Sequence, residues 1–280
     1  MLIDFEQKFG EYLHQYMHSS GLKEDEVEEQ VPELYLKWLD APQKWLSGQS
    51  PNAYFEAMDA GELVTMLGRY MISDMTVPGP LLNRIADISE DTYPLLVSLM
   101  QNYEGEKSDD ICTVIVKLIE EMDMPRPFAY YIDVVAKATQ PSDFAEACVE
   151  ELKSAGEEYT QKVISAYESA QSVYAADCFL DILADMPFDE RSYELALEKF
   201  LYSETNKAFY ASCLGKLGSD KALPYLEEAL RQDGIKYYDY VSIKNALEEL
   251  GGEVMIDLDF TDDKDYESLI NLEDQAWRLH

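Results

Sequence analysis

The sequence predicts an all-α protein, an α–α superhelix in which helical hairpins are stacked one after another. The first observation is that apolar residues recur three and four residues apart over most of the chain, which is helical spacing. The second is that one helical pattern returns about every 34 residues, which is typical of repeat arrays. The third is that 280 residues contain only 13 glycines and 11 prolines, too few for the many turns of an all-β fold.

The four cysteines mark equivalent positions of this repeated pattern. They are separated by 36, 30 and 35 residues, and an alanine fits the same position 33 residues after the last of them. The residues four before, one after and four after this position are mostly apolar, which makes one stripe along a helix. The five equivalent positions are Cys112, Cys148, Cys178, Cys213 and Ala246. We call the helices that carry them B helices.

A second helix, called A, is expected beside each B helix, so that every repeat is a hairpin that buries its apolar face against the next hairpin. The five expected A helices are 92–102, 128–139, 159–170, 190–202 and 221–232. Pro94 and Pro224 are expected in the first turns of their helices, where a missing N–H costs nothing. The five hairpins together occupy residues 91–252.

Residues 1–90 do not follow this pattern and are expected to form a helical N-terminal cap, which covers the first open apolar face of a solenoid. Its helices are expected at 2–18, 24–39, 51–59, 61–74 and 78–87. Ser50 before Pro51 is a typical N-cap followed by proline at the first helical position. Trp38 and Trp45 are expected to attach the intervening loop to the first helices.

Residues 253–280 are expected to form an acidic C-terminal cap. Within 254–260, apolar and polar residues alternate, which predicts a short extended strip, and a helix is expected after it. This strip could seal the last repeat or add to the sheet edge of a partner, and the sequence leaves open whether it pairs within or between chains.

Composition restricts the function. There are 22 Lys and Arg against 56 Asp and Glu, a formal net charge of −34, which argues against nucleic acid and anionic membranes as partners. No apolar run is long enough for a membrane span, and acids at Asp4, Glu6 and Glu11 argue against a signal peptide. The cysteines are interpreted as buried thiols, so we expect a cytoplasmic protein.

Residues 211–230 and 245–252 resemble the HEAT repeats of bacterial lyase-like proteins. The resemblance is carried by ASCLGKLGSDKALPYLEEAL and NALEELGG, in which a helix ends in an LG-x-LG pattern and the next helix carries Pro-x-Leu. It implies an armadillo-like superhelix used mostly as a protein-binding surface, and no catalytic motif is carried over. Enzymes of the wider group act on bilin chromophores or alkylated bases.

Other chemistry finds little support in the sequence. His14 and His18 lie four apart on the first expected helix, but the acid of a zinc-protease HExxH motif is replaced by Gln15. The aspartates between 257 and 265 do not match the glycine and glutamate positions of an EF-hand loop. We therefore expect no metal, no cofactor and no catalytic residue.

The candidate site is a binding surface along the exposed ridge of the B helices, together with two tyrosines in the last interhelical turn. Carboxylates steer a cationic partner, and exposed aromatics stack on its cations. The residues are Glu150, Glu151, Asp177, Asp181, Glu248, Glu249, Tyr237 and Tyr238.

This surface predicts a non-enzymatic scaffold whose acidic concave face binds a basic protein, for example as an immunity or inhibitor protein. The alternative is a lyase-like enzyme acting on a small chromophore or base. The oligomeric state is left open.

Overall fold

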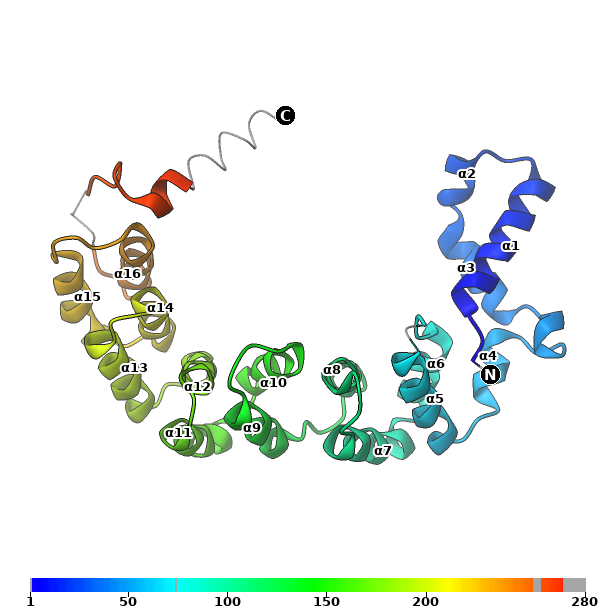
Figure 1. The fold of residues 1–280 in the computed structure, drawn as a ribbon, viewed down its shortest axis with the longest axis horizontal. Helices are drawn as coiled ribbons and strands as arrows, with labels where there is room; N and C mark the ends of the chain where they lie inside the picture. The colour runs from blue at the N-terminus through cyan, green and yellow to red at the C-terminus, as the bar shows by residue number, and fades with distance from the viewer. Residues whose placement is uncertain (1, 74, 254–257, 269–280) are drawn as a thin grey trace. The chain divides into compact units, whose positions relative to one another are not determined.

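The computed structural model describes residues 2–73, 75–253 and 258–268, and all regular structure in these residues is helical. Neighbouring helices pack against one another as in an α-solenoid, so the all-α prediction is confirmed (Figure 1). The chain divides into two compact units, which are described separately: residues 1–127 with 142–147, and residues 128–141 with 148–280.

Unit 1 holds the region expected as a cap and the first hairpin of the array. Its helices are α1 (Phe5–Ser20), α2 (Glu24–Glu28), α3 (Val31–Asp40), the 3-10 turn η1 (Lys44–Leu46), α4 (Pro51–Glu56), α5 (Ala60–Ile72), α6 (Gly79–Asp87), α7 (Ser89–Asn102) and α8 (Ser108–Glu121).

Unit 2 holds the remaining hairpins, with the first turn of α10 assigned to unit 1. Its helices are α9 (Phe128–Lys137), α10 (Asp143–Lys153), η2 (Glu157–Tyr159), α11 (Thr160–Ser169), α12 (Val173–Asp185), α13 (Glu190–Tyr202), α14 (Lys207–Leu217), η3 (Asp220–Ala222), α15 (Leu223–Leu230) and α16 (Tyr237–Glu249). The expected A helices therefore correspond to α7, α9, α11, α13 and α15.

The B helices α8, α10, α12, α14 and α16 each place the repeated position toward the core. Cys112, Cys148, Cys213 and Ala246 are all buried. Cys178 is half-buried, and the next residue of its helix, Phe179, is fully buried instead. The repeated pattern therefore marks the packing stripe of five helices, as predicted.

The last two B helices of unit 2 approach closely at a glycine. A Cβ on Gly215 of α14 would lie 3.0 Å from the Cα of Ala246 on α16 and would collide with the carboxylate of Glu249. Two small residues at the same height thus allow the backbones of α14 and α16 to come together. The spacing of this repeat depends on Gly215 having no side chain.

In unit 1, the expected helix over 24–39 is two helices. The helix is interrupted at residues 29–30, and α3 then begins at Val31 with Pro32 at its second position. Proline cannot supply the N–H that a continuous helix needs there, so the interruption follows from that residue. At α4 the prediction is confirmed, because the Ser50 side chain accepts a hydrogen bond from the Ala53 N–H at 3.2 Å.

The two tryptophans anchor an aromatic cluster at the start of unit 1, as expected. Trp38 is 1% exposed and stacks on Trp45, with ring centroids 6.2 Å apart. Phe5 of α1 meets both rings edge-on, and it also packs on Phe55 of α4. The loop that carries Trp45 is thereby held against α1 and α3.

The position expected for Pro94 is wrong. Helix α7 begins at Ser89 rather than near residue 92, so Pro94 lies inside the helix, where it cannot donate to the carbonyl of Glu90. The start of α7 is stabilised by a side chain instead, because the buried Thr92 hydroxyl donates a hydrogen bond to the Ile85 carbonyl of α6 at 2.7 Å. Pro224 lies in the first turn of α15, as predicted.

Helix α16 ends in a double-glycine cap. Gly251 has φ +81°, a conformation that residues with a side chain rarely adopt, and its N–H bonds to the Glu248 carbonyl at 3.0 Å. The N–H of Gly252 bonds to the Leu247 carbonyl at 2.8 Å, which completes a Schellman motif. Most of the expected strip over 254–260 lies outside the described residues, and residues 258–260 form no strand.

No helix in the described part of the chain is both long and apolar enough to cross a lipid bilayer.

Candidate binding site

A network of lysines and aspartates links three successive B helices of unit 2. Lys153 at the end of α10 lies 2.8 Å from Asp181 of α12, and Lys216 of α14 lies 3.2 Å from the same carboxylate. Asp185, one turn further along α12, lies 2.9 Å from Lys216 and 3.7 Å from Lys153. Glu150 completes the network at 2.8 Å from Lys153. The charged groups thus join α10, α12 and α14 side by side.

Helix geometry explains why these residues meet. Asp181 and Lys216 both lie three residues after their cysteines, which places them roughly a quarter turn from the middle of the apolar stripe. That position faces the neighbouring B helix, and the side chains are 25% and 37% exposed. Opposite charges at the same position of neighbouring repeats therefore pair between the helices.

The network fixes the protonation states of its members. Burial alone would raise the pKa of Asp181, but hydrogen bonds from Lys153 and Lys216 and their positive charges outweigh burial, so the pKa lies below its usual value. Burial would lower the pKa of Lys153, and its bonds to Asp181 and Glu150 outweigh that effect, so the pKa is raised. Asp181 is therefore ionised at neutral pH.

This shift predicts an acid-dependent stability. Because the pKa of Asp181 is lower in the folded state, its contribution is present above the unfolded value of 3.8 and is lost as pH falls through the folded value. We expect Asp181→Asn to reduce the free energy of unfolding by about 1 kcal/mol at pH 7. The difference from the parent protein should shrink as the pH falls below about 4.

Urea unfolding at pH 7, 4 and 2.5 measures this effect. Glu204→Gln is the matched control, because Glu204 is exposed and no ion pair is found for it in the described chain. A loss in Asp181→Asn that is equally large at pH 2.5 and pH 7 would show that the lysines do not stabilise the ionised carboxylate.

Asp177, the third acid on this stripe of α12, is held by hydrogen bonds. Its carboxylate accepts from the Tyr210 hydroxyl at 2.8 Å and from the Asn206 amide at 3.0 Å. Burial raises the pKa of Tyr210, and the neighbouring Asp177 raises it further, so the phenol stays protonated and continues to donate. Asp177 therefore belongs to the contact between α12 and α14.

The expectation that Glu151 is exposed is wrong. Glu151 is 8% exposed, whereas Glu150 beside it has a side chain that is 70% exposed. Glu151 lies three residues after Cys148, at the flank of the apolar stripe, and here the flank is buried. A ligand from solvent would thus meet Glu150 and not Glu151.

Glu248 and Glu249 at the end of α16 are exposed. Glu248 lies 3.9 Å from Lys244 of the same helix, at the limit of an ion pair. The carboxylate of Glu249 extends over Gly215 of α14, next to Lys216 in the sequence. The acids of α16 therefore extend the surface that begins at α10.

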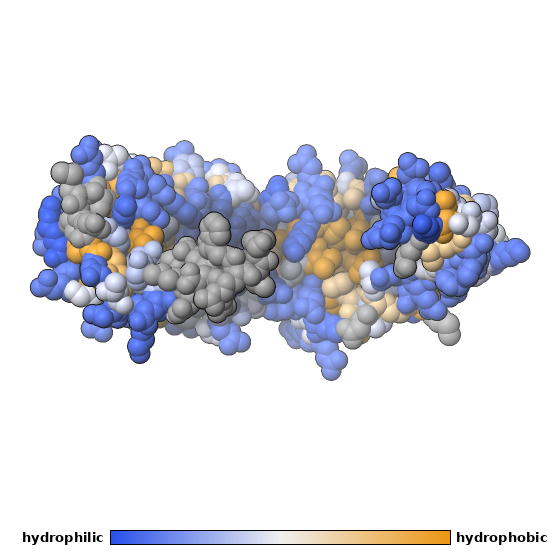
Figure 2. Space-filling view, turned by 90° about the horizontal axis from the view of Figure 1, so that it is seen from above, coloured by the Kyte–Doolittle hydropathy of each residue, from blue (hydrophilic) through white to orange (hydrophobic). Residues whose placement is uncertain are grey.

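We use the name B-helix ridge for a set of nine charged side chains on α10, α12, α14 and α16, all of them exposed or half-buried. It consists of Glu150, Lys153, Asp177, Asp181, Asp185, Lys216, Lys244, Glu248 and Glu249. It has six acids against three bases, so it stays negative after its internal ion pairs are counted. Hydrophilic residues cover most of the molecular face shown in Figure 2, with smaller hydrophobic areas between them.

Tyr237 and Tyr238 lie in the first turn of α16 and not in an interhelical turn, so this expectation is wrong. Tyr237 is half-buried in an aromatic cluster, with ring centroids 5.3 Å from Phe260 and 4.9 Å from Tyr266. Tyr238 is 52% exposed. Tyr238 alone of the two presents most of its ring to solvent.

Sequence reasoning missed Lys153 and Asp185. A signal was available within each helix, because Asp185 follows Asp181 by four residues and Lys153 follows Glu150 by three, so each shares a helix face with a predicted residue. Within the described residues, no three His, Cys, Asp or Glu side chains gather as metal ligands. His14 and His18 lie on one exposed face of α1, with ring centroids 4.5 Å apart.

Comparisons with family models, with curated protein sequences and with solved structures found no match.

Proposed function

We propose that this protein is a non-enzymatic cytoplasmic scaffold that binds a basic protein or peptide through the B-helix ridge. The observation that carries the proposal is the ridge itself, on which the six carboxylates of α10, α12 and α16 outnumber the three lysines of α10, α14 and α16. An inhibitor or immunity protein that masks a cationic partner would use such a surface in the same way.

The charges of the ridge support this function because several of them are fixed before a partner arrives. Asp181 and Asp185 are held by lysines, and Asp177 is held by Tyr210 and Asn206. A partner therefore meets ordered carboxylates and loses less side-chain entropy on binding. Glu150, Glu248 and Glu249 provide the exposed charges that attract it over a distance.

The test is capture of partners from a lysate of the source cell at about 50 mM and about 300 mM salt, followed by titration calorimetry with the recovered protein. We expect a basic protein that is retained at low salt and lost at the higher salt, because exposed charges are screened. The ridge variant Glu150→Gln/Glu248→Gln/Glu249→Gln should weaken binding at least tenfold, which is about 1.4 kcal/mol.

The matched control removes three exposed acids outside the ridge, in Glu104→Gln/Glu106→Gln/Glu204→Gln, and has the same net charge. It should bind within about twofold of the parent protein. Equal losses in both variants would mean that net charge, and not the ridge, determines binding. A parent protein that retains no basic protein at low salt would contradict the proposal.

A further inference from the structure

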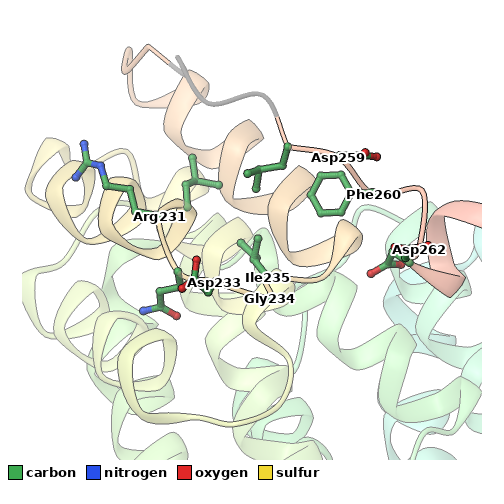
Figure 3. A pocket seen from close by; sticks show the side chains of 11 residues that line it. Arg231, Asp233, Gly234, Ile235, Asp259, Phe260 and Asp262 are labelled. Atoms are coloured by element: carbon green, nitrogen blue, oxygen red, sulfur yellow. The ribbon is translucent and has the colours of Figure 1, made fainter.

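A cavity of about 540 Å³ opens at the end of unit 2, between the α15–α16 loop and the segment that follows α16. One wall is the loop from Arg231 to Ile235, and the other is formed by residues 258–263 (Figure 3). Every lining residue belongs to the described part of the chain. The cavity is thus formed by two segments far apart in sequence.

The second wall contacts the start of α16 through a hydrogen bond and an aromatic cluster. The Asp263 carboxylate accepts hydrogen bonds from the backbone N–H groups of Tyr237 at 3.3 Å and Asp265 at 2.9 Å. The Phe260 ring packs against Tyr240 with centroids 5.0 Å apart, and it also contacts Tyr237. Both a helix N-terminus and an aromatic cluster hold residues 258–263 in place.

Apolar and acidic side chains together line the cavity. In Figure 3, Ile235 and Phe260 face the middle from opposite walls. Leu230 and Leu258 complete the apolar lining. The lining also contains Asp233, Asp259, Asp262 and Asp263, against one basic residue. An occupant with an aliphatic stem and a positive end matches both parts.

The basic residue of the lining does not neutralise these aspartates. Arg231 is paired along α15 with Glu227 at 3.3 Å and Glu228 at 3.7 Å, and in Figure 3 its guanidinium points away from the cavity. Asp259 accepts from Thr261, and Asp263 is engaged by α16. Asp233 and Asp262 have no hydrogen bond or ion pair to another described residue.

We propose that this cavity holds a lysine or arginine side chain of the basic partner, an inference that rests on the proposed function. The aliphatic stem packs on Ile235, Leu258 and Phe260, and the unpaired carboxylates, Asp233 on the loop wall and Asp262 on the opposite wall, attract the cation. The cavity then anchors one side chain of the partner, and the carboxylates of the B-helix ridge attract the rest of its basic surface.

The test uses the full chain with methyl-labelled isoleucine and leucine, titrated with N-acetyl-lysine N-methylamide and followed by NMR. We expect the Ile235 and Leu258 methyl signals to shift, with a dissociation constant in the range of about 1 to 10 mM. The norleucine analogue, which has the stem without the charge, should bind at least fivefold more weakly. Asp233→Asn/Asp262→Asn should weaken lysine binding by a similar factor.

Glu104→Gln/Glu204→Gln, which also removes two exposed acids, is the control and should bind the lysine probe as the parent protein does. Equal binding of the lysine and norleucine probes, or no shift up to about 50 mM, would overturn the inference. So would unchanged lysine binding in the Asp233→Asn/Asp262→Asn variant.

The two proposals fail separately. A captured basic protein that binds Asp233→Asn/Asp262→Asn as tightly as the parent protein would overturn the cavity inference and leave the ridge intact. Specific binding of the lysine probe, together with no basic protein captured at low salt, would support the cavity and contradict the scaffold function.

Discussion

Replacing Gly215 by leucine is expected to lower the free energy of unfolding of the last hairpins by about 3 kcal/mol. A Cβ at this position already approaches the Cα of Ala246 to 3.0 Å, so the neighbour that must move is backbone. The larger side chain would separate α14 from α16. In a repeat array each hairpin is stabilised mainly by its neighbours, so the loss should be concentrated in α13–α16.

Hydrogen exchange measured by mass spectrometry on peptides from α13–α16 and from α3–α5 locates this loss. Gly10→Leu is the matched control, because Gly10 lies on the exposed side of α1 with no atom within 4 Å of a Cβ placed there. That change should leave stability equal or slightly higher, since leucine favours helices more than glycine does. If Gly215→Leu increased the exchange rate, relative to the parent protein, more in α3–α5 than in α13–α16, the close contact between α14 and α16 would be contradicted.

Replacing Trp38 by alanine is expected to destabilise unit 1 by about 3 to 5 kcal/mol. Trp38 is 1% exposed and connects Phe5 of α1, Tyr35 of its own helix and Trp45 of the following loop. Its removal leaves a large cavity where three segments meet. The indole side chain is also the attachment point of that loop, so the loop should open first.

Chemical denaturation followed by near-ultraviolet circular dichroism, together with hydrogen exchange of α3–α5, measures the effect. Leu36→Ala is the control on the same helix, because Leu36 is 65% exposed and its truncation should change stability by less than about 0.5 kcal/mol. Similar losses from the two truncations would show that Trp38 is not the centre of the cluster.

Much of the fold could be predicted because equivalent residues of successive hairpins pack in the same way. The repeated position is buried at Cys112, Cys148, Cys213 and Ala246 and half-buried at Cys178, and the expected bounds of α13 agree with the structure at both ends. Breaks were harder to predict. Pro32 lies in the first turn of α3 and separates that helix from α2, whereas Pro94 lies inside α7, and the difference depends on which neighbouring groups can satisfy the backbone.

The candidate site was only partly predictable, because exposure depends on what covers the flank of a helix. Glu151, Asp181 and Glu249 all lie three residues after the repeated position, yet they are buried, half-buried and exposed in turn. The number of neighbouring helices and the lengths of their side chains determine this outcome. The sequence predicts Tyr237 in a turn because it does not reveal that α16 begins at that residue.

The positions of the cysteines have one more consequence. Each of four successive hairpins carries a single thiol, and burial raises the pKa of those in α8 and α14, to about 12 for Cys213. A buried neutral thiol reacts with an alkylating reagent only when its hairpin opens. The protein thus contains native reporters of local opening at residues 112, 148 and 213, and the progress of unfolding along the array can be followed without introducing a probe.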